Sequence, residues 1–327
     1  MSCGHDWWLG EGAKGPGPLH LRKTPPSPDP QSHKIIEPEK SGRRSAFSGS
    51  HKGLGGGFGG RAGTRVPGPP PKNPACGLDF GSRFVKLVYT RGEGFGRRQL
   101  DSLDFYREYL LRVNGHLVID WERLNLAPPA ALVVTGYGKN LLQEHFPTIT
   151  EIRAHFRGAK FQTGLTHFVL LEMGGQDTKV LYVRDGRVFD FLTNDRCAAG
   201  TGRYLENMSR FLKMPLRKFA GCAREPVEIS QTCAIFGESE LVGHLLEGVE
   251  PERIAAGVNA SVARRALAMV RRYRCPTLVF AGGVARNGAV VQFLRSLSDF
   301  RVLVPPHPQF SGALGCCLEA RQQLAPG

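Results

Sequence analysis

The chain has 327 residues, 41% of them hydrophobic, and a formal net charge of +14 at pH 7. That length allows one large domain or two ordinary ones. The eight cysteines include no Cys-x-x-Cys pair, which argues against a disulfide scaffold, a zinc ribbon or finger, and a thioredoxin-type site. This usage fits a reducing cytoplasm, which is the location we expect. No run of 18 apolar residues occurs, so no membrane span is expected.

The positive charge brings nucleic-acid binding into consideration. Residues 1–74 supply about +6 of the charge, and the rest is spread along the chain. One denser run has helical spacing, which is typical of a solvated helix face, with a docking patch for an acidic partner as the alternative. This run consists of Arg264, Arg265, Arg271, Arg272 and Arg274. Since no recognised nucleic-acid motif accompanies the charge, we expect no nucleic-acid partner.

Residues 1–74 differ in composition from the rest of the chain. They hold about half of the 23 prolines and over a third of the 41 glycines. Such a segment cannot bury enough apolar surface to offset the loss of chain entropy on folding. We predict a disordered, basic leader here. A start codon assigned too far upstream would produce the same kind of sequence.

From residue 75 onward, apolar runs alternate with turn residues. Six strands are predicted in the first part, at residues 76–80, 84–89, 131–134, 168–172, 179–183 and 188–191. Two hairpins among them resemble each other, because each has a strand ending in a carboxylate, a glycine-containing turn and a returning strand with a lysine. They lie about 93 residues apart, which indicates a weak internal duplication into halves 75–165 and 166–327.

From Gly200 the apolar pattern takes a helical period. Helices are predicted at residues 202–212, 234–246, 252–273 and 287–297 and from about 311, with strands at 277–281 and 302–304. The chain therefore reads as an α/β protein whose second half carries a helical insertion.

Three glycine turns are candidates for binding phosphate or nucleotide, because glycine lets backbone N–H groups approach phosphate oxygens. Asp79, Glu172 and Asp177 are the candidate catalytic carboxylates, since Mg²⁺ needs carboxylates, directly or through water. The candidate ATP-binding residues are Gly81, Ser82, Lys86, Gly174, Gly175, Gln176, Gly282, Gly283, Val284 and Asn287. No Gly-x-x-x-x-Gly-Lys-Ser/Thr occurs, which excludes a P-loop, and the Rossmann pattern lacks its third glycine. Lys86 and Lys179 either neutralise phosphate charge or are solvated strand lysines.

Cys197 and Cys233 each stand near the predicted start of a helix. A helix N-terminus favours anions and lowers the pKa of a thiol, so both are candidate metal ligands, with two buried thiols as the alternative. Two such cysteines make half of a four-cysteine site, which a symmetric dimer would complete for a [4Fe–4S] cluster. Cys222, Cys76 and the Cys316-Cys317 pair are interpreted as structural. His155, His167, His244 and His307 lack a zinc pattern and are interpreted as structural or surface residues.

Taken together and in order, these motifs resemble the BadF/BadG/BcrA/BcrD ATPase family, the activators of 2-hydroxyacyl-CoA dehydratases and benzoyl-CoA reductases. The resemblance covers residues from about 75 to 324. It is carried by Asp79-Phe-Gly-Ser82, Thr135-Gly-Tyr-Gly138, Thr150-Glu-Ile152, Gly174-Gly-Gln-Asp-Thr-Lys179, Cys197-Ala-Ala-Gly-Thr-Gly202, Cys233 with Glu238-Ser-Glu240, Gly282-Gly-Val-Ala285 with Asn287, and Gly312-Ala-Leu-Gly315.

The resemblance implies an actin–hexokinase (ribonuclease-H-like) duplicated fold with ATP and Mg²⁺ in a cleft between two halves. It implies a homodimer with one bridging [4Fe–4S] cluster, for which Cys197 and Cys233 stand at the ligand positions. It also implies an ATPase that passes one low-potential electron, received from a donor such as ferredoxin or flavodoxin, to an acyl-CoA dehydratase or reductase component.

The chain departs from the family pattern at two places in the turns. Arg83 stands where small residues are usual and either crowds or contacts the phosphates, and Glu172 replaces the usual Asp.

Two other functions remain as alternatives. One is a small-molecule kinase or cluster-free ATPase of the same superfamily, and the pair Cys197 and Cys233 argues against it. The other is a nucleic-acid-binding protein, which only the positive charge suggests.

Overall fold

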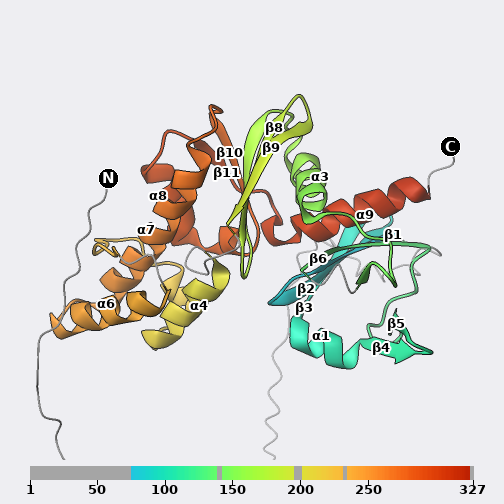
Figure 1. Cartoon of the computed structure of the whole chain (residues 1–327), viewed down its shortest axis with the longest axis horizontal. Coiled ribbons are helices and arrows are strands. Elements are labelled where there is room, and N and C mark those ends of the chain that lie inside the picture. Colours follow the sequence, from blue (N-terminus) through green and yellow to red (C-terminus); the bar gives the residue numbers. More distant parts are fainter. Residues whose placement is uncertain (1–74, 138–141, 195–200, 231–233, 325–327) are drawn as a thin grey trace, which may run out of the picture. The chain divides into compact units, whose positions relative to one another are not determined.

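The computed structural model describes residues 75–137, 142–194, 201–230 and 234–324, which all belong to one compact unit, Thr64–Gly327. The predicted leader, residues 1–74, and the two candidate cluster ligands, Cys197 and Cys233, lie outside the described residues. The elements below are therefore those of the described ranges (Figure 1).

The first sheet has four strands in the order β3-β2-β1-β6, with β6 parallel to β1 and the other pairs antiparallel. Its strands are β1 (Ala75–Phe80), β2 (Phe84–Arg91), β3 (Gly94–Asp101) and β6 (Ala131–Gly136). Every residue of the central strand β1 is buried, as expected for a strand covered on both faces. The three strands predicted here are confirmed. The edge strand β3 was not predicted, because its glycines, arginines and glutamine give little apolar alternation.

A small helix and a separate two-stranded sheet separate β3 from β6, and neither was predicted. These elements are α1 (Ser102–Glu108), β4 (Leu110–Val113) and β5 (His116–Ile119). Helix α1 begins at Asp101, whose carboxylate accepts a hydrogen bond of 2.9 Å from the amide of Leu103. This N-cap satisfies one of the amides that a helix start leaves unpaired.

The second sheet has five strands in the order β11-β10-β7-β8-β9. Its strands are β7 (Phe168–Met173), β8 (Thr178–Arg184), β9 (Arg187–Asn194), β10 (Thr277–Ala281) and β11 (Arg301–Leu303). Strands β7, β8 and β9 form the predicted antiparallel meander, whereas β10 pairs in parallel with both β7 and β11. All five predicted strands are confirmed, with ends that differ by at most three residues.

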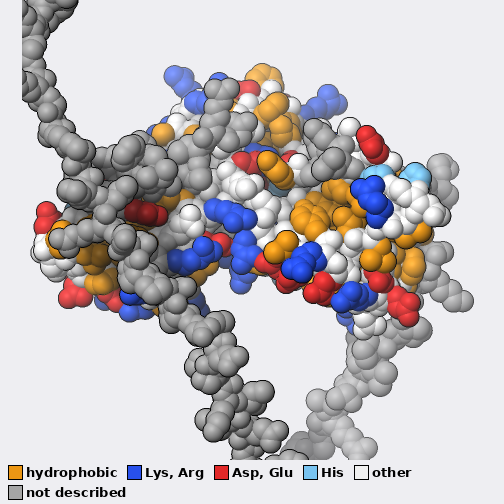
Figure 2. All heavy atoms as spheres, turned by 60° about the horizontal axis from the view of Figure 1, so that its bottom comes forward, with side chains coloured by type: hydrophobic (Ala, Val, Ile, Leu, Met, Phe, Trp, Pro, Cys, Tyr) orange, Lys and Arg blue, Asp and Glu red, His pale blue; other side chains and the backbone are white. Residues whose placement is uncertain are grey.

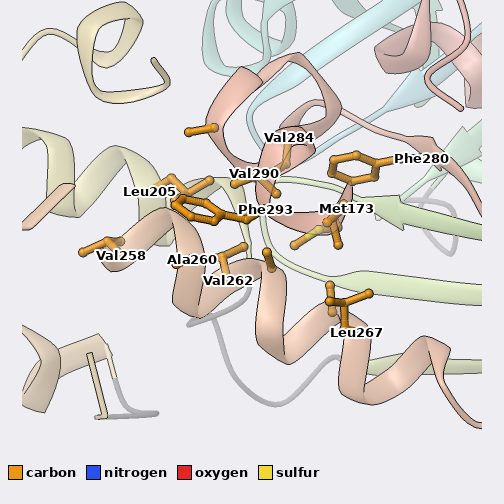
Figure 3. Packing of buried hydrophobic residues seen from close by; sticks show 14 of the residues in the cluster. Met173, Leu205, Val258, Ala260, Val262, Leu267, Phe280, Val284, Val290 and Phe293 are labelled. Atoms are coloured by element: carbon orange, nitrogen blue, oxygen red, sulfur yellow. The ribbon is translucent and has the colours of Figure 1, made fainter. Parts of the chain in front are cut away.

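Helices cover the second sheet and enclose its core. They are α4 (Gly202–Phe211), α5 (Leu216–Phe219), α6 (Ala234–Leu246), α7 (Pro251–Val270), the short helix η2 (Val284–Arg286) and α8 (Gly288–Ser296). Figure 3 shows Leu267 of α7, Phe280 of β10 and Phe293 of α8 among the buried side chains of this core. The predicted helices are confirmed, and α7 ends at Val270, before the dense arginine run is complete.

Two helices far apart in sequence pack against each other and against the first sheet. They are α3 (Glu151–Thr163) and α9 (Ser311–Gln323), which follows the short helix η3 (Pro308–Phe310). Glycine permits this packing, since a Cβ at Gly315 would lie 1.9 Å from the carbonyl oxygen of Ala154. Helix α9 therefore belongs by packing to the first sheet, although it lies in the predicted second half; the division at residues 165 and 166 stays a prediction.

The face drawn in Figure 2 carries Lys and Arg side chains close to Asp and Glu side chains. The ion pairs of the described residues include Arg83 with Asp101 and with Glu206. In the part of the chain that the structure describes, no helix is both long and apolar enough to span a bilayer.

Candidate nucleotide-binding cleft

A cavity of about 1040 Å³ lies where the two hairpin turns meet the helices of the second half. Twelve of the thirteen residues predicted for catalysis and ATP binding line it. These are Asp79, Gly81, Ser82, Lys86, Glu172, Gly174, Gly175, Gln176, Asp177, Gly283, Val284 and Asn287. The fold therefore brings together residues from both hairpins and from the turn after β10.

The first two glycine turns face each other directly. A Cβ placed on Gly175 would lie 3.0 Å from the Ser82 hydroxyl oxygen and 3.4 Å from the Cβ of Arg83. The absence of a side chain at Gly175 is what lets the β7–β8 turn approach the β1–β2 turn so closely. The expectation that the two turns face each other is confirmed.

In the first hairpin, Asp79 and Lys86 are cross-strand partners, and the Lys86 ammonium donates to the Asp79 carboxylate at 3.1 Å. Asp79 is only 4% exposed. Burial alone would raise the pKa of Asp79, but the neighbouring Lys86, together with His155 and Lys179, holds it below its ordinary value. The ionised form of Asp79 is thus favoured by the fold.

In the second hairpin, Glu172 and Lys179 occupy the equivalent cross-strand positions. Glu172 is 3% exposed, and its Oε2 atom lies 3.6 Å from the Lys179 ammonium without a hydrogen-bond partner. Burial outweighs the attraction of His155 and Lys179 and raises the pKa of Glu172 above its ordinary value. The fold therefore disfavours the ionised form of this carboxyl group.

The Lys179 ammonium forms ion pairs with three carboxylates. Its ammonium lies 2.5 Å from Asp177 and 2.6 Å from Glu151, closer than it lies to Glu172. These carboxylates raise the pKa of Lys179 against the opposing effect of its burial. Lys179 is buried, so the interpretation as a solvated strand lysine is wrong for it.

Glu151, at the first turn of α3, was not among the predicted site residues, although it lines the cavity. Two sequence signals mark the helix that carries it. Thr150 caps its start by accepting from the amide of Arg153, and Gly164 ends it with φ of +69°. A threonine and a glycine bracketing thirteen residues would have predicted α3, and with it a further carboxylate at the cleft beside Asp79, Glu172 and Asp177.

Mg²⁺ normally keeps several water ligands and takes one or two carboxylates together with substrate phosphates. Asp79, Glu172 and Asp177 fit that role, since all three line the cavity and the buried Glu172 Oε2 lacks a donor. Among the residues that the structure describes, no three His, Cys, Asp or Glu side chains form a cage for a metal ion. The donor set thus fits a hydrated Mg²⁺ bound to phosphates better than a metal bound by protein alone.

The third glycine turn combines structural and cavity-lining residues. Gly282, which was predicted to bind ATP, is not among the cavity-lining residues. It has φ of +88°, and a Cβ there would lie 2.2 Å from the Met173 carbonyl oxygen and 2.7 Å from Glu172 Oε1, so this position requires glycine. Gly283 has open space at its Cβ position and faces the cavity. Asn287 lines the cavity, but its side chain caps α8 and donates to Asn259 at 2.9 Å. Its amide is therefore already engaged within the protein.

The Arg83 side chain is held in place by neighbouring residues. Its guanidinium pairs with Asp101, lies over the Phe84 ring and reaches Glu206 of α4 at 3.5 Å. A second cross-cleft contact joins the Arg203 side chain to the Ser82 carbonyl oxygen at 3.2 Å. Both arginines link the first turn to α4.

Helix α4 is also bound to the second turn, through its backbone. The amide of Gly202 donates to the Gly174 carbonyl at 2.9 Å, and the amide of Arg203 donates to the Gly175 carbonyl at 3.0 Å. The first residues of α4 are thus bonded to both turns at which phosphates are expected.

The interpretation of Cys76, Cys316 and Cys317 as core residues is confirmed, whereas the structural role of Cys222 stays a prediction. Cys76, Cys316 and Cys317 are buried in the core, and burial raises the pKa of each thiol, that of Cys317 to about 12. Cys222 is partly buried, and its sulfur lies 3.3 Å from the Lys218 carbonyl oxygen.

Comparison with protein families gives a match over residues 123–320 to the model described as the BadF/BadG/BcrA/BcrD ATPase family. The chain belongs to this family. The matched range contains the second hairpin, α4 and the third glycine turn. The predicted family membership is confirmed.

Among relatives of this ATPase family, the 2-hydroxyisocaproyl-CoA dehydratase activator of Clostridioides difficile is 39% identical over 194 residues, which cover 58% of this chain and 73% of that protein. The crystal structure of the (R)-2-hydroxyglutaryl-CoA dehydratase component A of Acidaminococcus fermentans aligns with a TM-score of 0.68 at 29% identity, covering 78% of this chain and 100% of that one. The Clostridium difficile activator with bound ADPNP aligns with a TM-score of 0.67 at 32% identity, covering 78% and 98%. The predicted actin–hexokinase-type α/β fold is confirmed.

Proposed function

We propose that this chain is an ATP-hydrolysing activator that transfers a low-potential electron to a partner 2-hydroxyacyl-CoA dehydratase or benzoyl-CoA reductase. The electron would come from a [4Fe–4S] cluster that two copies of the chain hold between them. Relatives named as activators of CoA dehydratases support the partner class. A ferredoxin or flavodoxin is the proposed electron donor.

The proposed ATP site is the 1040 Å³ cavity. The amides of the two facing turns would bind phosphate oxygens, and Asp79, Glu172 and Asp177 would hold the hydrated Mg²⁺. The Mg²⁺ would neutralise phosphate charge. Asp177 is held by Lys179 at 2.5 Å, which keeps this carboxylate beside the Gly174 turn.

One observation supports the proposed coupling between ATP and the cluster: the first residues of α4 are hydrogen-bonded to both glycine turns. Gly202, the first residue of α4, lies five positions after Cys197, and Ala234, the first residue of α6, directly follows Cys233. A movement of the two glycine turns would therefore shift the start of α4, the helix that follows the proposed ligand Cys197. Exposure and nearby dipoles set the reduction potential of an iron–sulfur cluster, which supports the coupling.

The test is iron and acid-labile sulfide per chain after anaerobic purification, with subunit number from light scattering. We expect about two of each per chain, since one four-iron cluster would serve a dimer. Cys197→Ser and Cys233→Ser should lose the iron and keep nucleotide binding.

Cys222→Ser is the matched control and should keep the iron, because Cys222 contacts only neighbouring protein atoms in the described structure. A wild-type chain that binds ATP but carries no iron would overturn the electron-transfer proposal. A small-molecule kinase or a cluster-free ATPase would then remain.

A further inference from the structure

His155 lies on the face of α3 that turns toward the cleft. It follows Glu151 by four residues, so the two side chains project from the same side of the helix. Glu151 pairs with Lys179 at 2.6 Å, and both Glu151 and His155 line the cavity. A helix that the sequence motifs did not reveal thus places two polar side chains at the phosphate end of the site.

The imidazole of His155 shares a narrow space with Asp79. A Cβ placed on Gly312, in the first turn of α9, would lie 3.0 Å from Asp79 Oδ2, 3.0 Å from His155 Cε1 and 3.1 Å from His155 Nε2. Gly312 therefore leaves room for both the carboxylate and the ring edge beside the backbone of α9. Any larger residue at this position would press on both groups.

Two buried polar atoms in this region have no hydrogen-bond partner within the described protein. They are His155 Nδ1 and Glu172 Oε2, and their residues are 5% and 3% exposed. A buried polar atom without a hydrogen-bond partner is destabilising, so both atoms are candidates for contacts with a bound ligand or water. Among the neighbours that lower the pKa of Glu172, His155 has the largest effect, ahead of Lys179.

We propose that His155 is a positioning residue that orients the Asp79 and Glu172 carboxylates toward the hydrated Mg²⁺ of bound Mg–ATP. An imidazole has two ring nitrogens that can form hydrogen bonds, so it can hold water molecules between the carboxylates and the metal ion. The proposal rests on the ATP-hydrolysing part of the proposed function and is independent of the cluster and of the partner enzyme.

The experiment compares His155→Ala, His155→Gln and Gly312→Ala with the wild type. The affinity for ATP is measured by calorimetry with Mg²⁺ and with EDTA, and kcat and KM are measured by phosphate release. For His155→Ala we expect a loss of about 10–100-fold in kcat and in the part of ATP affinity that depends on Mg²⁺. The affinity for ATP in EDTA should stay within about twofold, because the amides that bind phosphate are untouched.

His155→Gln should restore part of the loss, because an amide keeps a donor and an acceptor. Gly312→Ala removes no polar group, yet it should shift kcat and the Mg²⁺ dependence in the same direction by displacing Asp79 and His155. The matched control is His167→Ala, an exposed histidine outside the cavity, which should behave like the wild type.

The proposal is overturned if His155→Ala keeps the wild-type kcat and Mg²⁺ dependence, or if it lowers only the melting temperature. Equal losses of ATP affinity with Mg²⁺ and in EDTA would also refute it, since they indicate a general role in folding the cleft. If the wild type binds ATP without hydrolysing it, the ATPase proposal fails, and the Mg²⁺-dependent affinity still decides the role of His155. A chain without iron that shows the expected His155 effects would refute only the electron-transfer proposal.

Discussion

The two hairpins at the cleft share the same backbone arrangement, but the pKa values of their buried carboxyl groups are shifted in opposite directions. Lys86 follows Asp79 by seven residues, Lys179 follows Glu172 by seven residues, and each pair is in register across its hairpin. The last paired residues enclose four-residue turns in both cases, residues 81–84 and 174–177. Yet the pKa of Asp79 is lowered and the pKa of Glu172 is raised.

Neighbouring elements cause this difference. Lys86 has Asp79 as its carboxylate partner among the described ion pairs, whereas Lys179 is shared with Asp177 in the same turn and with Glu151 from α3. Both of the latter lie closer to the ammonium than Glu172 does, and for Glu172 burial outweighs the attraction of His155 and Lys179. A repeated pair of residues thus provides one carboxyl group whose ionised form the fold favours and one whose ionised form it disfavours.

Lys179→Met should have the largest effect on stability. It leaves Glu151, Glu172 and Asp177 beside one another without their shared cation, and breaking a buried ion pair costs about 3–5 kcal/mol. Lys86→Met removes one charged hydrogen bond, worth about 1.5–3 kcal/mol. Urea unfolding without nucleotide measures both; equal losses in the two variants would contradict the comparison.

Asp79→Asn and Glu172→Gln should change stability in opposite directions at pH 7 without nucleotide. Asp79→Asn removes a carboxylate that the fold prefers ionised and should destabilise by about 1.5–3 kcal/mol. Glu172→Gln removes the cost of ionising a buried carboxyl group, and should stabilise by about 1.4 kcal/mol for every unit by which the pKa of Glu172 is raised. Thermal unfolding would measure both changes.

The pH dependence separates the same two groups. Because the pKa of Asp79 is lowered, its contribution is fully present above its ordinary value of 3.8 and is lost as the pH falls through the folded-state pKa. Because the pKa of Glu172 is raised, the folded state binds the extra proton, and stability falls as the pH rises from 4.5 through the folded-state pKa. Glu172→Gln should abolish that fall, and an unchanged profile would contradict the assignment.

The pair of Arg83 and Glu206 should have the smallest effect. Its side chains are 35% and 19% exposed, so solvent weakens the attraction, and a double-mutant cycle with Arg83→Ala and Glu206→Ala should give a coupling of about 0.5–1 kcal/mol. The same cycle on ATP affinity would show whether this cross-cleft contact opposes nucleotide entry. Strictly additive effects on both quantities would remove Arg83 as a link between the first turn and α4.

Much of the molecule follows from the sequence by itself. Period-two and helical apolar patterns, punctuated by glycine and proline, predicted both hairpins, the β10–α8 unit and helices α4, α6 and α7. The carboxylate beside each glycine turn, and the equal spacing to Lys86 and Lys179, predicted which residues would meet at the cleft. These are local signals, because a turn and its flanking strands are adjacent in the chain.

Only the tertiary structure decided which groups act on those residues. Glu151 and His155 reach the cleft because α3 packs between α9 and the second sheet, through contacts that join segments over 150 residues apart, such as Arg153 with Glu319. Gly312 makes room for Asp79 and His155 from the far end of the chain. Sequence spacing does not reveal such contacts between distant segments. The pKa of Glu172 depends on these contacts, because burial and the distance to neighbouring charges shift the pKa of a carboxyl group.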